Sequence, residues 1–292
     1  MNIFERHRLA RRLYNEIAII QWPNNAQEPD YVAKLVEVLP GVMTNALHSI
    51  LPGRNISSGG AFIHQKPLAH FINKPGYNNP EFGDLLIVCR ERRTSGFVYN
   101  AMLLQAKKTR NPLSVHIPND HQFVLYSEWP EFEYKRAGWL NGKRRSVLPK
   151  TITQGAQYLL IDEHHPVDSL TATVDIPLCE SRLFANTLAS ILSFDDGRTF
   201  QATNPRDDWS QMILDLLRLS ASAYYNRRNS GYVGANRWNG DTAFNYILNA
   251  DAQDNTMNEL KRFQDVKGEE SQTGISVICV DLGAIESNEG MN

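Results

Sequence analysis

This sequence has little cysteine, no long apolar run and no excess of charge of either sign. Its three cysteines, Cys89, Cys179 and Cys279, lie too far apart for a C-x-x-C metal pair and leave no even disulfide framework. The longest apolar runs, such as residues 85–89, fall far short of the ~18 residues that a membrane-spanning helix needs. No apolar signal segment opens the chain. These absences predict a soluble protein of the reducing cytoplasm, with no membrane partner.

The balance of charge excludes a globally basic binder of nucleic acid. The 30 Lys and Arg residues face 32 Asp and Glu residues, which gives a formal net charge of −2. Any surface for nucleic acid must therefore be local. Hydrophobic residues make up 42% of the 292 residues, enough to fill a core and to exclude disorder of most of the chain. At ~100 to 200 residues per domain, this length allows one elaborated domain or two small ones.

The spacing of apolar residues predicts a mixed α/β fold. Helices are predicted over residues 3–20, from an N-cap at Asp30 to Leu39, over 43–51 after a kink or interruption at Pro40-Gly41, and over 151–162, 182–192 and 209–225. Strands are predicted over residues 61–65, 83–90, 97–107, 170–176 and 275–282. The polar stretch 90–96 joins two of these strands, so residues 83–107 are predicted to form a hairpin with a basic tip.

Residues 110–150 interrupt this order with four prolines and a series of aromatic side chains between positions 123 and 139. An Asn141-Gly142 pair within this stretch predicts a second, smaller hairpin. The aromatic series either stacks on splayed bases or forms a satellite core. We interpret residues 110–150 as an insertion into a core of residues 1–178, with residues 179–292 as a mainly helical region packed on that core.

Three polar side chains are predicted to meet at the base of the long hairpin. Asp84 opens its first strand, and Gln105 and Lys107 close its second. Since side chains alternate along a strand, Gln105 and Lys107 share a face, and the hairpin brings the end of one strand beside the start of the other. A carboxylate and an amide oxygen suit Mg²⁺ or Mn²⁺, which would activate water beside a scissile phosphate. Lys107 would hold that water or stabilise the transition state.

Other residues are candidates for accessory roles at the same site. Glu81 precedes Asp84 by three residues and is a candidate for a further metal ligand. His64 lies on the strand before the site and either contacts phosphate, assists proton transfer or is structural. Gln154 and Tyr158 are one turn apart on the predicted helix after Lys107, where they could face the site.

Two basic blocks flank the predicted site along the chain. Their candidate phosphate-binding residues are Arg90, Arg92, Arg93, Lys108 and Arg110 in the first block, and Lys143, Arg144 and Arg145 in the second. Such blocks bind phosphates without regard to base sequence, with an affinity that falls as salt rises. The alternative is that they are ordinary solvated hairpin tips.

This pattern resembles the PD-(D/E)xK nuclease superfamily, which has the restriction-endonuclease-like fold. The family's second-strand Asp matches Asp84 in Pro80-Glu81-Phe82-Gly83-Asp84, and its third-strand motif matches Gln105-Ala106-Lys107 as a Q-x-K variant. The resemblance covers roughly residues 30–176, where the predicted order is similar to the family's αβββαβ core. It implies metal binding by Asp84 and Gln105 and a further acid on the first helix, for which Glu37 is the candidate.

Two functions remain open for this sequence. The first is a Mg²⁺- or Mn²⁺-dependent endonuclease that hydrolyses DNA, in a bacterial restriction or anti-phage system, with a homodimer implied by the resemblance. The second is a catalytically inactive subunit of the same fold that binds nucleic acid or acts as a scaffold in a defence complex. Its motivation is Gln105, because a neutral amide is a weaker Mg²⁺ ligand than a carboxylate. A weaker third possibility is a helical interaction protein whose function lies in residues 181–292.

Overall fold

The computed structural model describes residues 1–22, 26–63, 67–114, 121–174, 181–226 and 273–283. Helices in these ranges are α1 (Ile3–Ala18), α2 (Glu28–Ile50), α3 (His121–Glu128), α4 (Phe184–Leu192) and α5 (Asp208–Asn226). The strands are β1 (Ser57–Ala61), β2 (Leu68–Phe71), β3 (Leu85–Arg93), β4 (Gly96–Thr109), β5 (Phe132–Lys135), β6 (Arg144–Arg145), β7 (Ala156–Asp162), β8 (Leu170–Ala172), β9 (Arg182–Leu183), β10 (Arg198–Phe200) and β11 (Ser276–Asp281). No helix among the described residues is both long and apolar enough to cross a lipid bilayer.

A mixed sheet of eight strands forms the centre of the molecule. Its order is β1-β11-β3-β4-β7-β8-β9, and β10 pairs with β4 off this path. β11 runs parallel to β3, and β7 runs parallel to β4, while the other neighbours are antiparallel. A separate sheet has the order β2-β5-β6. The predicted α/β class with a mixed sheet is therefore confirmed.

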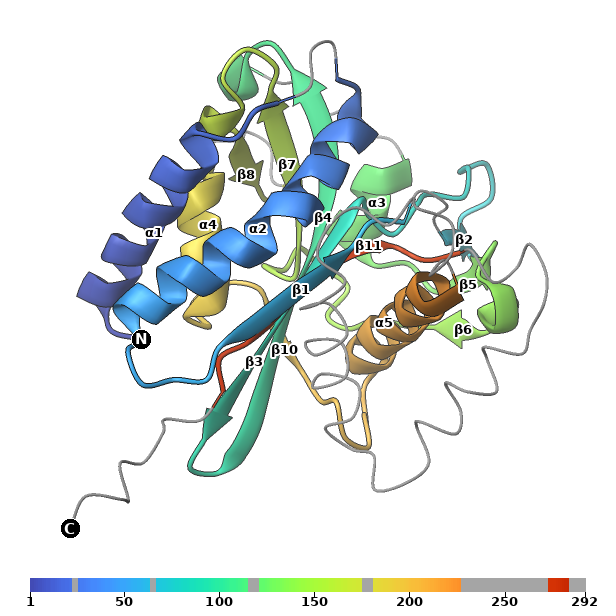
Figure 1. Cartoon of the computed structure of the whole chain (residues 1–292). Coiled ribbons are helices and arrows are strands. Elements are labelled where there is room, and N and C mark those ends of the chain that lie inside the picture. Colours follow the sequence, from blue (N-terminus) through green and yellow to red (C-terminus); the bar gives the residue numbers. More distant parts are fainter. Residues whose placement is uncertain (23–25, 64–66, 115–120, 175–180, 227–272, 284–292) are drawn as a thin grey trace.

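Both faces of the central sheet are covered, and alternate side chains of each strand enter different cores. Leu85 and Leu104 pack with α1, α2 and α4 on one face. Leu86 and Leu103 pack on the other face with α3, α5 and the small sheet. Figure 1 shows this division, with α1, α2 and α4 on one side of the strands and α5 and the small sheet on the other. The position of a polar residue in this alternation along β3 or β4 therefore decides on which face of the sheet its side chain lies.

The N-terminal helices begin at reciprocal side-chain caps. In α1, Asn2 Oδ1 accepts a hydrogen bond from the Glu5 amide at 2.9 Å, and Glu5 accepts one from the Asn2 amide at 2.8 Å. The prediction that Asp30 is the N-cap of α2 is wrong, because the helix already begins at Glu28. The Asp30 carboxylate instead accepts a hydrogen bond from the Gln27 amide at 2.8 Å.

Of the two alternatives predicted at Pro40, a kink or an interruption, the interruption is wrong, because α2 continues through this residue. A proline removes one backbone donor, but Pro40 is buried, and the helix packs closely on β1. A Cβ on Gly60 of β1 would lie 3.0 Å from the Val36 carbonyl oxygen, the acceptor that Pro40 leaves free. Tertiary packing therefore maintains the helix where the local sequence favours an interruption.

The long hairpin of β3 and β4 is confirmed, with its tip between Arg93 and Gly96. The smaller hairpin is also present, since β5 pairs with β6 around Asn141-Gly142. The first predicted strand lies earlier than expected, at β1, and β8 is shorter than predicted. The predicted helices and strand after residue 180 correspond to α4, α5 and β11.

The predicted helix over residues 151–162 is wrong, because residues 156–162 form strand β7. Tyr158 and Leu160 enter one core, whereas Leu159 and Ile161 enter the other. A strand buried on both faces is apolar throughout, and such a run resembles a buried helix in sequence. The helix that connects β4 to β7 is α3, which lies inside the predicted insertion.

The expected division at residue 178 does not coincide with a break in the sheet. β9, β10 and β11 come from the region beyond it, and all three belong to the central sheet. β11 lies between β1 and β3, with backbone partners on both sides. The described residues on either side of this boundary therefore share one sheet.

Candidate active site

Asp84 lies immediately before β3, in a backbone position that only glycine at residue 83 allows. The Asp84 amide donates to the Leu104 carbonyl oxygen at 2.8 Å, and the Tyr126 hydroxyl donates to the Phe82 carbonyl oxygen at 2.7 Å. A Cβ on Gly83 would approach the Tyr126 hydroxyl oxygen to 2.9 Å and the Leu104 oxygen to 3.1 Å. This close packing holds the carboxylate of Asp84 against the end of β4.

Asp84 and Gln105 are in direct contact. Asp84 Oδ2 accepts hydrogen bonds from Gln105 Nε2 and from the backbone amide of Ala106, the latter at 2.7 Å. The exposed fractions of the two residues are 4% and 3%. A buried carboxylate needs such donors, because burial without them is costly. Lys107 follows on the same face of β4, beside Leu160 of β7, and is half-exposed.

Helix α3 contributes a glutamine that the sequence analysis missed. Gln122 Nε2 donates to Gln105 Oε1 at 2.8 Å. Tyr126, one turn further along α3, holds the segment before Asp84 through Phe82. The Gln-x-x-x-Tyr spacing is present in the sequence, but it falls within residues 110–150, which the sequence predicts to be an insertion.

The corresponding prediction for Gln154 and Tyr158 on a helix is wrong, since Tyr158 belongs to strand β7. Gln154 precedes this strand and accepts a hydrogen bond from Gln157 Nε2 at 3.0 Å. Tyr158 is buried beside Gln105 in the β4–β7 register, so only the tyrosine of this pair lies near the site.

Glu81 lies near the site, whereas Glu37 does not. Burial raises the pKa of the Tyr126 hydroxyl, and the negative charges of Asp84 and Glu81 raise it further. These charges are therefore close to one hydroxyl group. Glu37 is exposed on α2, which covers the opposite face of the sheet, and it pairs with Lys34 at 3.0 Å. His64 lies outside the described residues.

The expectation that two basic blocks flank the site holds only in part. β3 runs away from Asp84, so Arg92 lies about 26 Å further along the strand at ~3.3 Å per residue. Arg90 and Arg93 lie at the same far end, so this part of the first block does not flank the site. Lys108 and Arg110 follow Lys107 and remain at the site's end of β4.

Several of these basic residues form ion pairs within the protein. Arg90 binds Asp281 with its Nη2 at 2.6 Å, Arg93 binds Glu91 at 2.8 Å, Arg110 binds Glu163 at 2.8 Å and Arg145 binds Asp215 at 2.6 Å. Lys108 donates to the Ala26 carbonyl oxygen, Lys143 lies 4.5 Å from the centre of the Trp139 ring, and Arg144 is 3.9 Å from Glu133. Arg90 and Arg145 are thus structural residues.

The aromatic series of residues 123–139 is mostly core. Tyr126, Trp129, Phe132 and Tyr134 are buried, and their rings pack on one another and on Phe82. Trp129 also packs edge-on against Trp209 of α5, with 5.7 Å between ring centroids. These four rings therefore cannot stack on bases, and they instead support the segment that carries Asp84.

The oxygen donors of this site suit a hard divalent cation. Among the residues that the structure describes, no three His, Cys, Asp or Glu side chains cluster as a metal site. Asp84 offers a carboxylate, and Gln105 offers an amide oxygen that now accepts from Gln122. Rotation of the Gln105 amide would turn this oxygen toward Asp84. Such a set fits Mg²⁺ or Mn²⁺ and lacks the nitrogen or sulfur ligands typical of zinc.

Comparisons of this chain with protein-family models, with curated proteins and with solved structures find no match. The contacts at the site therefore carry the functional inference. These are a buried carboxylate, two amides linked to it in series and a half-exposed lysine on the same face of β4.

Proposed function

We propose that this protein is a metal-dependent nuclease that hydrolyses phosphodiester bonds of DNA, as a Q-x-K variant of the PD-(D/E)xK superfamily. The observation that carries the proposal is the contact between Asp84 and Gln105, with Lys107 two residues further along the same face. A carboxylate, an amide and an ammonium at one strand end can together serve a cation, a water molecule and a phosphate.

The order of elements supports the resemblance. α2, β1, β3, β4, α3 and β7 follow one another as helix, three strands, helix and strand, with β2 between β1 and β3, and β5 and β6 between α3 and β7. The hairpin of β3 and β4 is antiparallel, and β7 is parallel to β4. One departure is the position of β11, which separates β1 from β3.

We assign the cation to Asp84 and Gln105, with Glu81, whose charge also acts on Tyr126, as a candidate further ligand. Bound Mg²⁺ or Mn²⁺ would acidify a water molecule and neutralise charge on the scissile phosphate. The Ala106 amide donates to Oδ2 of Asp84 at 2.7 Å, and this bond fixes the orientation of the carboxylate beside Gln105. Gln105 would exchange its contact with Gln122 for a contact with the metal. Lys107 orients the attacking water and stabilises the negative charge of the transition state.

The setting that we propose is a restriction or anti-phage system of the bacterial cytoplasm, with the protein as a homodimer that cuts both strands. This setting comes from the resemblance. The free, buried thiols of Cys89 and Cys279 agree with a reducing compartment. Arg110, which follows the site's end of β4 and has an 86% exposed side chain, is the basic residue best situated to meet the DNA backbone.

Cleavage assays with plasmid and single-stranded DNA in Mg²⁺ or Mn²⁺ test this proposal. We expect Asp84→Asn and Lys107→Ala each to lower the rate by at least about a hundredfold, because each removes a charge that acts in the transition state. Excess EDTA should abolish cleavage by the wild-type protein. Lys135→Ala is the matched control, since this lysine lies on the small sheet and pairs with Glu133. Wild-type rates in Asp84→Asn would refute the assignment.

A second candidate function is the inactive, nucleic-acid-binding or scaffold subunit. It is favoured by Gln105, whose amide nitrogen and oxygen are both engaged, with Asp84 and Gln122 respectively. Calorimetric titration with Mn²⁺ separates the two functions. A nuclease should bind the ion with a heat that Asp84→Asn removes, whereas an inactive subunit should give no such heat and no cleavage.

A further inference from the structure

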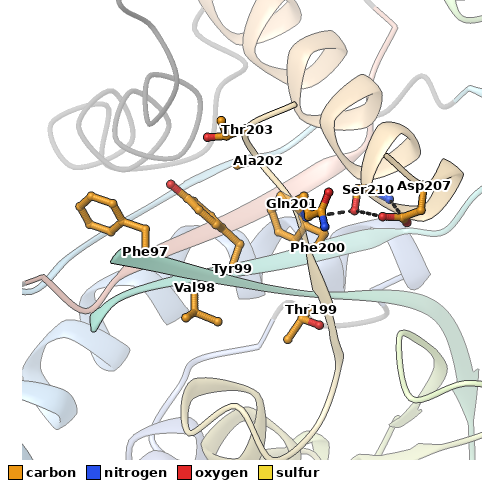
Figure 2. Close-up of a pocket in the computed structure, with 10 residues that line it drawn as sticks. All are labelled: Phe97, Val98, Tyr99, Thr199, Phe200, Gln201, Ala202, Thr203, Asp207 and Ser210. Carbon is orange, nitrogen blue, oxygen red and sulfur yellow. Dashed lines mark hydrogen bonds between the residues drawn. The ribbon is translucent and has the colours of Figure 1, made fainter. Parts of the chain in front are cut away.

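A pocket of about 440 Å³ lies between β4, β10 and the start of α5. Its aromatic side is formed by Phe97, Tyr99 and Phe200, as Figure 2 shows. The ring centroids of Tyr99 and Phe200 are 5.4 Å apart, and those of Phe97 and Tyr99 are 6.4 Å apart. Tyr99 and Phe200 are buried, whereas Phe97 is 40% exposed. Phe97 therefore offers an apolar surface on which a planar ring can stack, and the two buried rings support it from behind.

The opposite side of the pocket is polar and carries a carboxylate. Asp207 precedes α5 and accepts hydrogen bonds from the Ser210 amide at 2.9 Å and from the Ser210 hydroxyl at 2.7 Å. The Ser210 hydroxyl in turn accepts from the Gln201 amide at 2.9 Å. These contacts, drawn in Figure 2, hold Asp207 in place. Each carboxylate oxygen keeps a second lone pair, so the exposed side chain of Asp207 can accept from an amino group.

A cation lies beside the aromatic end of the same pocket. Arg92 is opposite Phe97 in the β3–β4 register, with its guanidinium 5.6 Å from the centre of the Phe97 ring. Its neighbours Arg90 and Arg93 are paired with Asp281 and Glu91, whereas Arg92 is exposed. An exposed guanidinium at this place can bind a phosphate.

We infer that this pocket binds a nucleotide whose base carries an exocyclic amino group. The base stacks on the aromatic side, Asp207 accepts from the amino group, and Arg92 binds the phosphate. The volume falls in the usual range of small-molecule pockets, ~300 to 1,000 Å³. The nucleotide comes either from solution or from a single-stranded nucleic acid.

The pocket is independent of the site at Asp84. Phe97 and Gln105 share a face of β4, but they are eight residues apart, or about 26 Å at ~3.3 Å per residue. Binding is therefore measured in EDTA, where the proposed hydrolysis cannot occur. Failure of this inference and failure of the nuclease proposal then have different readouts.

Calorimetric titration with dCMP and dTMP tests whether Asp207 recognises the amino group of the base. Cytosine presents an amino donor where thymine presents a carbonyl acceptor, so dCMP should bind about tenfold more tightly than dTMP. Asp207→Asn keeps a side chain that can cap α5 but replaces the all-acceptor carboxylate, and it should remove this preference. Equal affinities for dCMP and dTMP in the wild-type protein would overturn the inference.

Two further variants test the other contacts. Phe97→Leu should weaken both nucleotides about tenfold, because it removes a stacking surface, while Phe97→Tyr should bind like the wild-type protein. Arg92→Ala should weaken dCMP about tenfold but leave deoxycytidine, which has no phosphate, within twofold. Tyr77→Ala is the matched control, since this exposed tyrosine packs on Phe71 outside the pocket. An unchanged dCMP affinity in Phe97→Leu and Arg92→Ala would refute the site.

Fluorescence anisotropy with labelled ten-nucleotide oligo-deoxycytidine and oligo-thymidine distinguishes the two sources. Tighter binding of oligo-deoxycytidine than of dCMP, with the same loss in Asp207→Asn, identifies a single strand as the ligand. Equal or weaker binding of the oligonucleotide identifies the free nucleotide. No binding of either dCMP or oligo-deoxycytidine would overturn the inference.

Discussion

Asp215 is a buried carboxylate of α5 that receives its hydrogen bonds from the small sheet. Arg145 donates to it from Nε at 3.1 Å and from Nη2 at 2.6 Å, and the Tyr134 hydroxyl donates at 3.3 Å. The side chain of Asp215 is 3% exposed and that of Arg145 is 16% exposed. Because a buried charge without its partner is costly, this pair joins β6 to α5.

Arg145→Ala should therefore lower stability rather than binding. We expect a loss of about 3 kcal/mol in the free energy of unfolding, since Tyr134 would be the one remaining partner of Asp215 among the described residues. Chemical denaturation followed by circular dichroism measures this loss. Arg144→Ala, at the neighbouring and 63% exposed side chain, should stay within about 0.5 kcal/mol of the wild-type protein. Equal stability of the two variants would contradict this role for Arg145.

At the residue scale, alternation along strands is enough to predict the contact between Asp84 and Gln105. This contact follows from the alternation of side chains along two strands that are adjacent in the chain. Gln122 could not be found in this way, because its contact with Gln105 depends on how the chain returns after β4. The structural roles of Arg90 and Arg145 could not be predicted for a related reason. A run of arginines in sequence does not reveal the buried Asp281 or Asp215 that pairs with two of them.

At the scale of the element, β11 completes the sheet between two strands that are distant from it in sequence. Val277 and Cys279 are paired with residues of β1 on one side and of β3 on the other. All six residues of the strand are buried. An element with partners on both sides contributes to the cooperativity of the whole sheet.

A chain that ends after Gly274 should therefore fail to fold cooperatively. It lacks β11, so β1 and β3 lose their common neighbour and expose unpaired backbone groups. A chain that ends after Gly283 is the matched control, since it keeps all of β11. Thermal melting followed by circular dichroism compares the two. The same sharp transition in both chains would show that β11 is dispensable.

The position of β11 also bears on the third possibility for function, in which residues 181–292 carry the activity. A truncation near residue 178 would remove β9, β10 and β11 from the central sheet. Loss of activity in such a chain would report loss of the fold. Point variants at Asp84 and in the pocket near Phe97 are the better way to locate function.

Whole elements were predictable from sequence where their periodicity was unambiguous, as for α1 and the hairpin of β3 and β4. β7 was mistaken for a helix because it is apolar on both faces and so shows no alternation. Short strands that pair at a distance, such as β9 and β10, have too few residues for any pattern. Their place in the sheet depends on contacts that lie far apart in the chain.

At the scale of the whole molecule, two cores on opposite faces of one sheet isolate its centre from solvent. Cys89 belongs to the core under α1 and α2, and Cys279 belongs to the core on the other face. Both residues are fully buried, and burial raises the pKa of both thiols. Less thiolate is then present at a given pH than in the unfolded chain.

The reactivity of these two thiols should report whether the centre of the sheet is accessible to solvent. In Cys179→Ser, which leaves only Cys89 and Cys279, we expect no reaction with a disulfide reagent at pH 8 in native buffer. Both thiols should react once denaturant unfolds the protein, because unfolding restores access and lowers the pKa. Absorbance of the released thiolate follows the reaction. Rapid labelling of either cysteine in native buffer would contradict the central position of these two strands.

β11 is translated long after its neighbour β3, and this delay has a consequence during synthesis on the ribosome. About 180 residues separate the end of β3 from the start of β11. At ~5 to 20 residues per second, roughly 10 to 40 s pass between the translation of these two neighbours. Through that interval the nascent chain carries an open apolar strand edge, the kind of surface to which chaperones bind and through which chains aggregate. Expression at a lower temperature, or with more chaperone, should therefore raise the yield of the folded protein.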